Sequence, residues 1–438
     1  MSASFLDLPQ TETFCLRNAT LPTVCVPSFS GPAREGLVRA DVVISDGRIA
    51  VVAAPGAASP EIEAVDLKGA QVWPAFTDMH THLDKGHIWN RRPNRDGSFD
   101  GAIEAVRADR DLNWSADDVR ARMDFSLRCA YAHGTRLIRT HLDSLGPQHR
   151  ITWPVFAEMR EAWQGRIALQ AAALIPLEAT EDRAWFDELV RLIVDCGGVL
   201  GGLTRMGPNL EAELDLLFQT AIDNDLDIDL HVDETADAEV LTLAAIAEAA
   251  LRHKYQGQVV VGHCCSLARQ DADTAARTID KVAQAGLAVV SLPMCNMYLQ
   301  DRNGGTPAWR GVTLFKELAA AGVATAVSSD NTRDPFYAYG DLDPAEVFRE
   351  AVRILHLDHP LDEAARVVTS TPAAILRRPE LGVIEAGGAA DLVIFRARDW
   401  SELLSRPQSD RIVLREGRAI DRTLPDYSEL DHLLECRT

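Results

Sequence analysis

The sequence predicts an α/β fold, a (β/α)8 TIM barrel joined to a small β-sandwich formed from both chain ends. Between Gln71 and Asp330, short apolar runs rich in β-branched residues alternate with longer amphipathic stretches. The runs end at intervals of about thirty residues, the length that a parallel strand, a crossover helix and two short loops require. Eight ends of this kind occur, near His80, His141, Gln170, Gly201, His231, His263, Pro293 and Asp330.

Three stretches between these strands carry further signals. Residues 115–133 and 236–252 have the apolar periodicity or the alanine and leucine content of helices that cover a barrel. The first interval between strands is about twice as long as the others. It contains residues 89–111, which are rich in Arg, Asn, Asp and Gly. We expect this segment to be an extended loop over the barrel mouth, in the position of a lid.

The chain ends predict a second, smaller domain. Residues 12–70 and 381–422 contain short strands with turn signals at Asp46-Gly47 and at Glu416-Gly417. Because the two stretches flank the barrel, we expect them to pair with each other. The predicted domains are therefore a β-sandwich over residues 1–70 and 381–438 and a barrel over residues 71–380.

Composition excludes several classes of function. Among 438 residues, 65 are acidic and 44 are basic, which gives a net charge of −21. Such a surface repels nucleic acid and anionic lipid. No membrane span or secretory signal is predicted. The cysteines form no CxxC pair, so we expect reduced thiols and a soluble, cytoplasmic protein. They are Cys15, Cys25, Cys129, Cys196, Cys264, Cys265, Cys295 and Cys436.

Groups that can bind a divalent metal occur at four of the predicted strand ends. They are His80, His82, His231, His263 and Asp330. Residues i and i+2 of a strand point the same way, so His80 and His82 can reach one ion. Active sites of such barrels lie at the carboxyl ends of the strands. The joint placement therefore predicts a metal site. A single histidine more often satisfies a hydrogen bond, and whether His141 belongs to the site stays open.

Over essentially its whole length, the chain resembles the amidohydrolase superfamily. The resemblance rests on PAFTDMHTH (74–82), HVDE (231–234), Gly262-His263, Ser329-Asp330 and GGAADLVI (387–394). It implies that His80, His82, His231 and Asp330 hold the ion, as in members with one metal. Members with two ions usually bridge them with a modified lysine on strand four, and residues 197–204 contain no lysine. The resemblance thus implies one divalent ion, Zn²⁺ or Fe²⁺, with Mn²⁺ as an alternative.

Within the superfamily, the chain is most similar to the cytosine deaminase group. His231-Val-Asp-Glu234 matches its HxxE signature, Ile167-Ala-Leu-Gln170 matches its glutamine strand, and Asp334-Pro-Phe-Tyr337 also resembles that group. That group tends to place two carboxylates after strand eight, whereas this chain has Asp330-Asn331. Together with His82-Leu-Asp-Lys85, this pair looks like N-isopropylammelide amidohydrolases, which remove an alkylamine from s-triazine rings. Pterins and other lactam-bearing rings, as in pterin deaminases, would also suit such a pocket.

These residues predict a hydrolytic deaminase. A bound Zn²⁺ or Fe²⁺ lowers the pKa of its water from about 15.7 toward about 7, so hydroxide can attack the amine-bearing carbon and release ammonia or an amine. Asp330 would take the proton, Glu234 would protonate the ring and the leaving group, and His263 would assist the attacking oxygen or polarise the reacting carbon. The predicted substrate contacts are Gln170, Lys85 and Asn331. Alternatively, His263 and Gln170 are structural and Lys85 is a solvated charge.

Two alternatives to deamination stay open. The same metal hydroxide could hydrolyse an amide or a cyclic amide, and ammonia release separates these reactions. A barrel without metal could serve as a scaffold, although every expected ligand type is present. Neither GxSxG nor GxxxxGK[ST] occurs, which excludes the corresponding hydrolases and nucleotide-binding loops. We expect a small heterocyclic substrate and no nucleic acid or membrane partner. The sequence leaves the oligomeric state open, with a homo-oligomer as one alternative.

Overall fold

A computed structural model describes residues 5–434. The chain divides into two compact units. Unit 1 comprises the residues up to 78 together with 129–137 and 343–424. Unit 2 comprises residues 79–128, 138–342 and those from 425 onward. The candidate site lies wholly within unit 2.

Unit 1 is built on one network of paired strands drawn from both ends of the chain. The strands follow the order β17-β16-β15-β6-β1-β3-β2, with β4 paired to β3 and β5 paired to β1. Because β6 pairs with β1 in parallel and with β15 antiparallel, the two ends share one sheet. The strands are β1 (Thr13–Pro22), β2 (Ala33–Arg34), β3 (Leu37–Ser45), β4 (Arg48–Ala53), β5 (Ala64–Asp66), β6 (Gln71–Pro74), β15 (Leu392–Phe395), β16 (Ile412–Arg415) and β17 (Arg418–Ala419).

The two predicted hairpin turns of unit 1 are confirmed. Asp46 and Gly47 connect β3 with β4 at φ values of 50° and 75°, and Glu416 and Gly417 connect β16 with β17 at 46° and 74°. Two successive residues with positive φ are what a type I′ turn requires. Local sequence therefore determines both hairpins.

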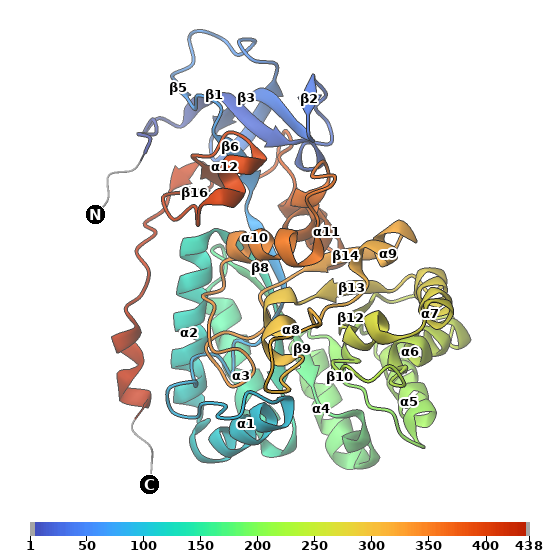
Figure 1. Cartoon of the computed structure of the whole chain (residues 1–438). Helices are drawn as coiled ribbons and strands as arrows, with labels where there is room; N and C mark the ends of the chain where they lie inside the picture. Colours follow the sequence, from blue (N-terminus) through green and yellow to red (C-terminus); the bar gives the residue numbers. More distant parts are fainter. Residues whose placement is uncertain (1–4, 435–438) are drawn as a thin grey trace. The chain divides into compact units, whose positions relative to one another are not determined.

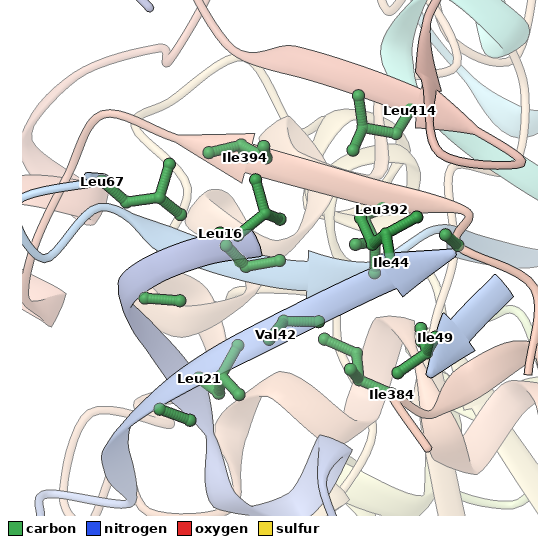
Figure 2. Packing of buried hydrophobic residues seen from close by; sticks show 14 of the residues in the cluster. Leu16, Leu21, Val42, Ile44, Ile49, Leu67, Ile384, Leu392, Ile394 and Leu414 are labelled. Carbon is green, nitrogen blue, oxygen red and sulfur yellow. The ribbon is translucent and has the colours of Figure 1, made fainter. Parts of the chain in front are cut away.

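An aliphatic core holds the sheet of unit 1 together (Figure 2). Leu16 of β1, Ile44 of β3, Leu392 of β15 and Leu414 of β16 point into one cluster. Each of these side chains is almost fully buried. Burial of apolar area is the dominant favourable term in folding, so the packing of residues more than 300 positions apart ties the chain ends together.

Unit 2 contains a TIM-barrel-like α/β arrangement. Strands β10 to β14 form a parallel sheet, and β7, β8 and β9 form a second sheet. Isolated parallel bridges link Ala172 with Val199, Pro176 with Leu203, and Thr81 with Asp330. The strands are β7 (Phe76–Thr81), β8 (Thr135–Asp143), β9 (Ala168–Leu174), β10 (Leu200–Leu203), β11 (Ile228–Val232), β12 (Val259–His263), β13 (Ala288–Ser291) and β14 (Ala324–Val327). A strand thus ends close to each predicted position.

Helices alternate with these strands, and α3 contacts α4, α5 contacts α6, and α6 contacts α7 (Figure 1). Most of α2 belongs to unit 2, whereas its last residues and the first three residues of both β7 and β8 belong to unit 1. The helices are α1 (Phe99–Asn113), α2 (Ala116–His133), α3 (His149–Ala162), α4 (Arg183–Asp195), α5 (Leu210–Asp223), α6 (Thr242–Arg252), α7 (Ala272–Gln284), α8 (Pro293–Leu299) and α9 (Phe315–Ala320). Unit 1 adds α10 (Pro344–Leu355), α11 (Ser370–Ile375) and α12 (Trp400–Ser405).

The predicted helices at 115–133 and 236–252 correspond to α2 and to α6, which begins only at Thr242. The prediction of an extended loop at 89–111 is wrong for its second half, which belongs to α1. The Ser98 side chain caps this helix by accepting a hydrogen bond from the Gly101 amide, and Ala102 and Val106 are buried. An N-cap serine followed by apolar residues four apart is a helix signal. This signal was missed in the sequence because the segment as a whole is rich in charged and polar residues.

No helix within residues 5–434 is long and apolar enough to cross a membrane. The seven cysteines in this range are free thiols, and Cys436 lies outside the described residues.

A buried ion pair joins two distant segments of unit 1. Both Nη atoms of Arg411 donate to Asp343, each over 2.6 Å, and the Asp343 side chain also caps α10 by accepting from the Ala345 amide. Burial alone would raise the pKa of Asp343, but the charges of Arg411 and His133 outweigh it and hold the pKa well below its ordinary value of 3.8.

We expect Asp343→Asn to lower the free energy of unfolding by about 3–5 kcal/mol at neutral pH, because Arg411 stays buried without its carboxylate. A lowered pKa in the folded state stabilises the protein above the unfolded pKa, and this contribution disappears as the pH falls through the folded pKa. The difference between wild type and variant, measured by urea unfolding, should therefore shrink from about pH 6 to about pH 3. A constant difference would contradict this account, and the exposed Asp362→Asn serves as the control.

Candidate active site at the carboxyl ends of the strands

Unit 2 brings all five predicted metal-binding residues together. His80 and His82 lie at the end of β7, His231 in β11, His263 at the end of β12, and Asp330 three residues after β14. His231 Nε2 lies 3.2 Å from the Nε2 atoms of both His80 and His82. Asp330 Oδ1 lies 3.2 Å from His82 Nε2 and 3.6 Å from His80 Nε2. All five residues are buried.

The distances among these donors fit a single divalent ion. Two atoms bound to one ion at about 2.0–2.1 Å lie about 3.0–3.6 Å apart at the usual coordination angles. Burial and the neighbouring histidines lower the pKa values of His80 and His231 well below 6.5, and burial followed by the Lys85 charge does the same for His82. The three imidazoles are therefore neutral at pH 7 and offer the lone pairs that a metal requires. Nitrogen and carboxylate donors suit zinc and iron.

The backbone at these strand ends takes unusual conformations. His263 and Asp330 have φ values of 69° and 64°. These values lie in the left-handed region, which residues other than glycine seldom adopt. Gly262 lets the backbone of β12 approach the His80 ring closely, because a Cβ atom at Gly262 would lie 2.8 Å from Cε1 of His80. Residues in such conformations cluster at functional sites. The lack of a side chain at Gly262 thus lets β12 lie directly against the imidazole ring of His80 in β7.

A second carboxyl group lies beside this cluster. Glu234 Oε1 accepts a hydrogen bond from Asn296 Nδ2 at 3.1 Å and lies 3.3 Å from His263 Nδ1. Burial and the charge of Asp330 raise the pKa of Glu234 well above 4.5, which favours its protonated form. Burial lowers the pKa of His263 to about 3. The site therefore holds a carboxyl group with a raised pKa next to a neutral imidazole.

The cluster opens into a cavity with a largely apolar wall. Helix α1 forms one side of the cavity, and the segments that follow β9 and β10 form another. Its apolar lining includes Phe99, Ile103, Val106, Leu174, Ile175, Leu203 and Phe336, while Arg107, Arg110 and Arg205 add cationic groups. The helix that the sequence analysis missed is thus part of the cavity wall.

Two predicted substrate contacts, Lys85 and Asn331, line this cavity. Lys85 Nζ lies 2.8 Å from Asp143 Oδ1. Burial would lower the pKa of Lys85, but the charges of Asp143 and Asp84 outweigh it and raise the pKa. Asn331 Nδ2 donates to Asp334 Oδ2 at 2.7 Å, which orients the amide.

The third predicted contact, Gln170, is not brought to the cavity. It lies inside β9, which continues to Leu174, and its Oε1 accepts hydrogen bonds from Arg139. Sequence reasoning also missed Asp143, Asn296 and the arginines of the cavity wall. Asp143 could have been found, since it follows the His141 strand position by two residues. Asn296 carries no comparable signal, because it lies in a short helix after β13.

Comparisons with known proteins match the chain over most of its length. Residues 63–145 and 166–420 match the model of the amidohydrolase family. Pterin deaminase of Rhizobium rhizogenes is 65% identical over 435 residues, which cover 99% of this chain and 100% of that protein. N-isopropylammelide isopropyl amidohydrolase of Pseudomonas sp. is 26% identical, with 82% and 88% covered.

Among solved structures, 5-methylcytosine deaminase of Klebsiella pneumoniae with bound 5-fluorocytosine superposes with a TM-score of 0.79 at 21% identity. The match covers 94% of this chain and 98% of that one, and it shows a shared fold. The family match extends over most of the residues that build the strands and the site described above. The chain belongs to the amidohydrolase family.

Proposed function

We propose that this protein is a metal-dependent hydrolytic deaminase whose substrate is a pterin or a closely related aminoheterocycle. The observation that carries the proposal is the buried His80, His82, His231 and Asp330 cluster, which opens beside Glu234 into a largely apolar cavity. The pterin assignment is supported by the 65% identity to a pterin deaminase over nearly the whole chain. The expected reaction replaces an exocyclic amine by oxygen and releases ammonia.

One divalent ion, Zn²⁺ or Fe²⁺ with Mn²⁺ as an alternative, is the proposed cofactor, with His80, His82, His231 and Asp330 as its ligands. A bound ion of this kind supplies a nucleophile at neutral pH by lowering the pKa of water. The neutral imidazoles and the 3.2 Å separations among their nitrogens support this ligand set.

Two carboxyl groups in different environments are proposed to transfer the protons of the reaction. Glu234 is the proposed general acid, because its raised pKa keeps a proton on the carboxyl group that it can deliver to a ring nitrogen. Asn296 and His263 hold this carboxyl in place from one side. Asp330 is the proposed base, and its charge is one reason why Glu234 keeps its proton. His263 is the proposed partner of the attacking oxygen.

The cavity supports the recognition of a flat ring with polar edges. Its apolar wall can pack on the faces of a heterocycle, while Lys85 and Asn331 offer donors at one rim. Asp143 and Asp334 keep these two groups in place. We propose Lys85 and Asn331 as the substrate contacts. Gln170 would need a rearranged β9 to reach this cavity, so no contact with substrate is assigned to it.

We further propose that the bridges in unit 2 complete a closed (β/α)8 barrel over residues 71–380, and that residues 1–70 and 381–438 fold as a β-sandwich. The pairing of Thr81 with Asp330 supports closure between the first and last strands. A cytoplasmic location and a homo-oligomeric state remain predictions.

The ligand assignment predicts that His231→Ala weakens metal binding by about 100-fold or more, since even residues that support a ligand contribute 10- to 100-fold. Metal content after dialysis, measured by plasma mass spectrometry, checks this. Replacement of the exposed His432 by Ala is the control and should leave the metal content unchanged. A fully loaded His231→Ala would remove His231 from the ligand set.

The general-acid assignment predicts that Glu234→Gln keeps its metal but loses turnover by about 100- to 10,000-fold, the usual contribution of a positioned acid. The measurement is kcat with metal content determined on the same sample. Glu239→Gln, an exposed change in the same loop, is the matched control. Turnover at the wild-type rate would exclude Glu234 from the mechanism.

The substrate proposal predicts ammonia release from pterins by the metal-loaded enzyme. A coupled ammonia assay with pterin, cytosine, isoguanine, creatinine and an N-alkylated hydroxytriazine checks this. Release from pterin well above the other rings is the expected result. If a fully metal-loaded enzyme releases no ammonia from any of these compounds, deamination of these rings is contradicted and hydrolysis of a cyclic amide is favoured.

A further inference from the structure

His141, near the end of β8, lies against three of the proposed ligands. Its ring centroid is 4.0 Å from that of His80, 4.7 Å from that of His231 and 5.6 Å from that of His82. One potential ligand atom from each of these four histidines lies within 4.8 Å of all the others. His141 is fully buried, and its Nδ1 atom has no hydrogen-bond partner among the described residues. Buried ring nitrogens are normally paired, so this nitrogen is a candidate metal ligand.

A series of buried polar side chains holds the His141 ring in place. His141 Nε2 lies 3.1 Å from Asp229 Oδ1, and both side chains are inaccessible to solvent. Arg139 Nη1 donates to the other oxygen of Asp229 at 3.0 Å. Gln170 Oε1 accepts from Arg139 at 2.7 and 3.1 Å. Gln170, which the cavity does not use, thus completes a polar network that ends at His141.

This arrangement matches a known feature of metal centres. A histidine that binds a metal usually gives its second ring N–H to a carboxylate or a carbonyl, which fixes its tautomer and raises its basicity. His141 has such a carboxylate in Asp229. Among the described residues, the Nδ1 atoms of His80 and His231 have no hydrogen-bond partner. When Nε2 of His141 carries the proton toward Asp229, Nδ1 is the nitrogen left with a lone pair.

We propose that His141 is a further metal-binding residue of this centre, oriented by Asp229 and Arg139. The centre then offers four imidazoles in addition to Asp330. This donor set favours ions with high affinity for imidazole, such as Zn²⁺, over Mn²⁺, which prefers oxygen donors. The negative charge of Asp229 would offset part of the charge of the ion in a dry interior. The inference rests on the metal site proposed above and adds a ligand to it.

The test compares wild type with His141→Asn and Asp229→Asn. Affinity for Zn²⁺ is measured by competition with a chelator, and the visible spectrum is recorded after loading with Co²⁺. We expect His141→Asn to bind Zn²⁺ about 10- to 100-fold more weakly and to change the intensity and position of the Co²⁺ bands, with a smaller loss for Asp229→Asn. His87→Asn is the matched control, since His87 is also buried in unit 2 but packs against Phe125 away from the cluster.

Zinc affinity and a Co²⁺ spectrum equal to those of wild type in His141→Asn would overturn the inference while the proposed function stands. Failure of the wild type itself to bind any divalent ion would overturn both. If His141→Asn does not fold, X-ray absorption of zinc-loaded wild type decides the question. Scattering from four imidazoles that persists in His263→Asn supports His141 as a ligand, and scattering from three in wild type excludes it.

Discussion

The site depends on one constraint, the burial of several imidazoles and carboxylates in contact with each other. His80, His82 and His231 cannot all be protonated when their nitrogens lie 3.2 Å apart in the interior, and burial drives their pKa values down. Each neutral imidazole keeps one nitrogen lone pair, so imidazoles that converge offer a set of donors to a cation. The left-handed backbone of His263 and Asp330 and the missing Cβ of Gly262 are local features that make this convergence possible.

The same constraint separates the two carboxyl groups. Two acids in one buried site cannot both ionise without strong repulsion, so one of them keeps its proton. Asp330 lies among the histidines, where an ion would stabilise its charge. Glu234 faces Asn296 and His263, which carry no charge at neutral pH, and its pKa is raised. Position thus supports the proposed division into one base and one acid, although the two residue types have nearly the same intrinsic pKa.

Sequence patterns predicted the strands and the convergence of the candidate metal ligands, because both depend on local periodicity. Each predicted strand end lies near the end of an observed strand, and the strand ends of a parallel α/β fold meet on one side, so His80, His231 and Asp330 had to converge. The misses have a different origin. Gln170 was placed at a strand end, but β9 continues for four residues, so the glutamine faces Arg139. Helix α1 was missed because the residues before it, 89–98, are rich in Arg, Asn and other polar residues typical of a loop. Asn296 was missed because its position depends on how β13 leads into α8.

Strands and connecting segments contribute different parts of the candidate site. The histidines lie on strands, whose spacing is fixed by backbone hydrogen bonds, and a fold with this spacing persists at 21% identity in an enzyme that binds 5-fluorocytosine. The cavity wall comes from α1 and from the segments after β9 and β10, where insertions and substitutions leave the strand pairing intact. The proposed ligands thus lie at the ends of strands, while the cavity wall comes from elements that local periodicity does not reveal.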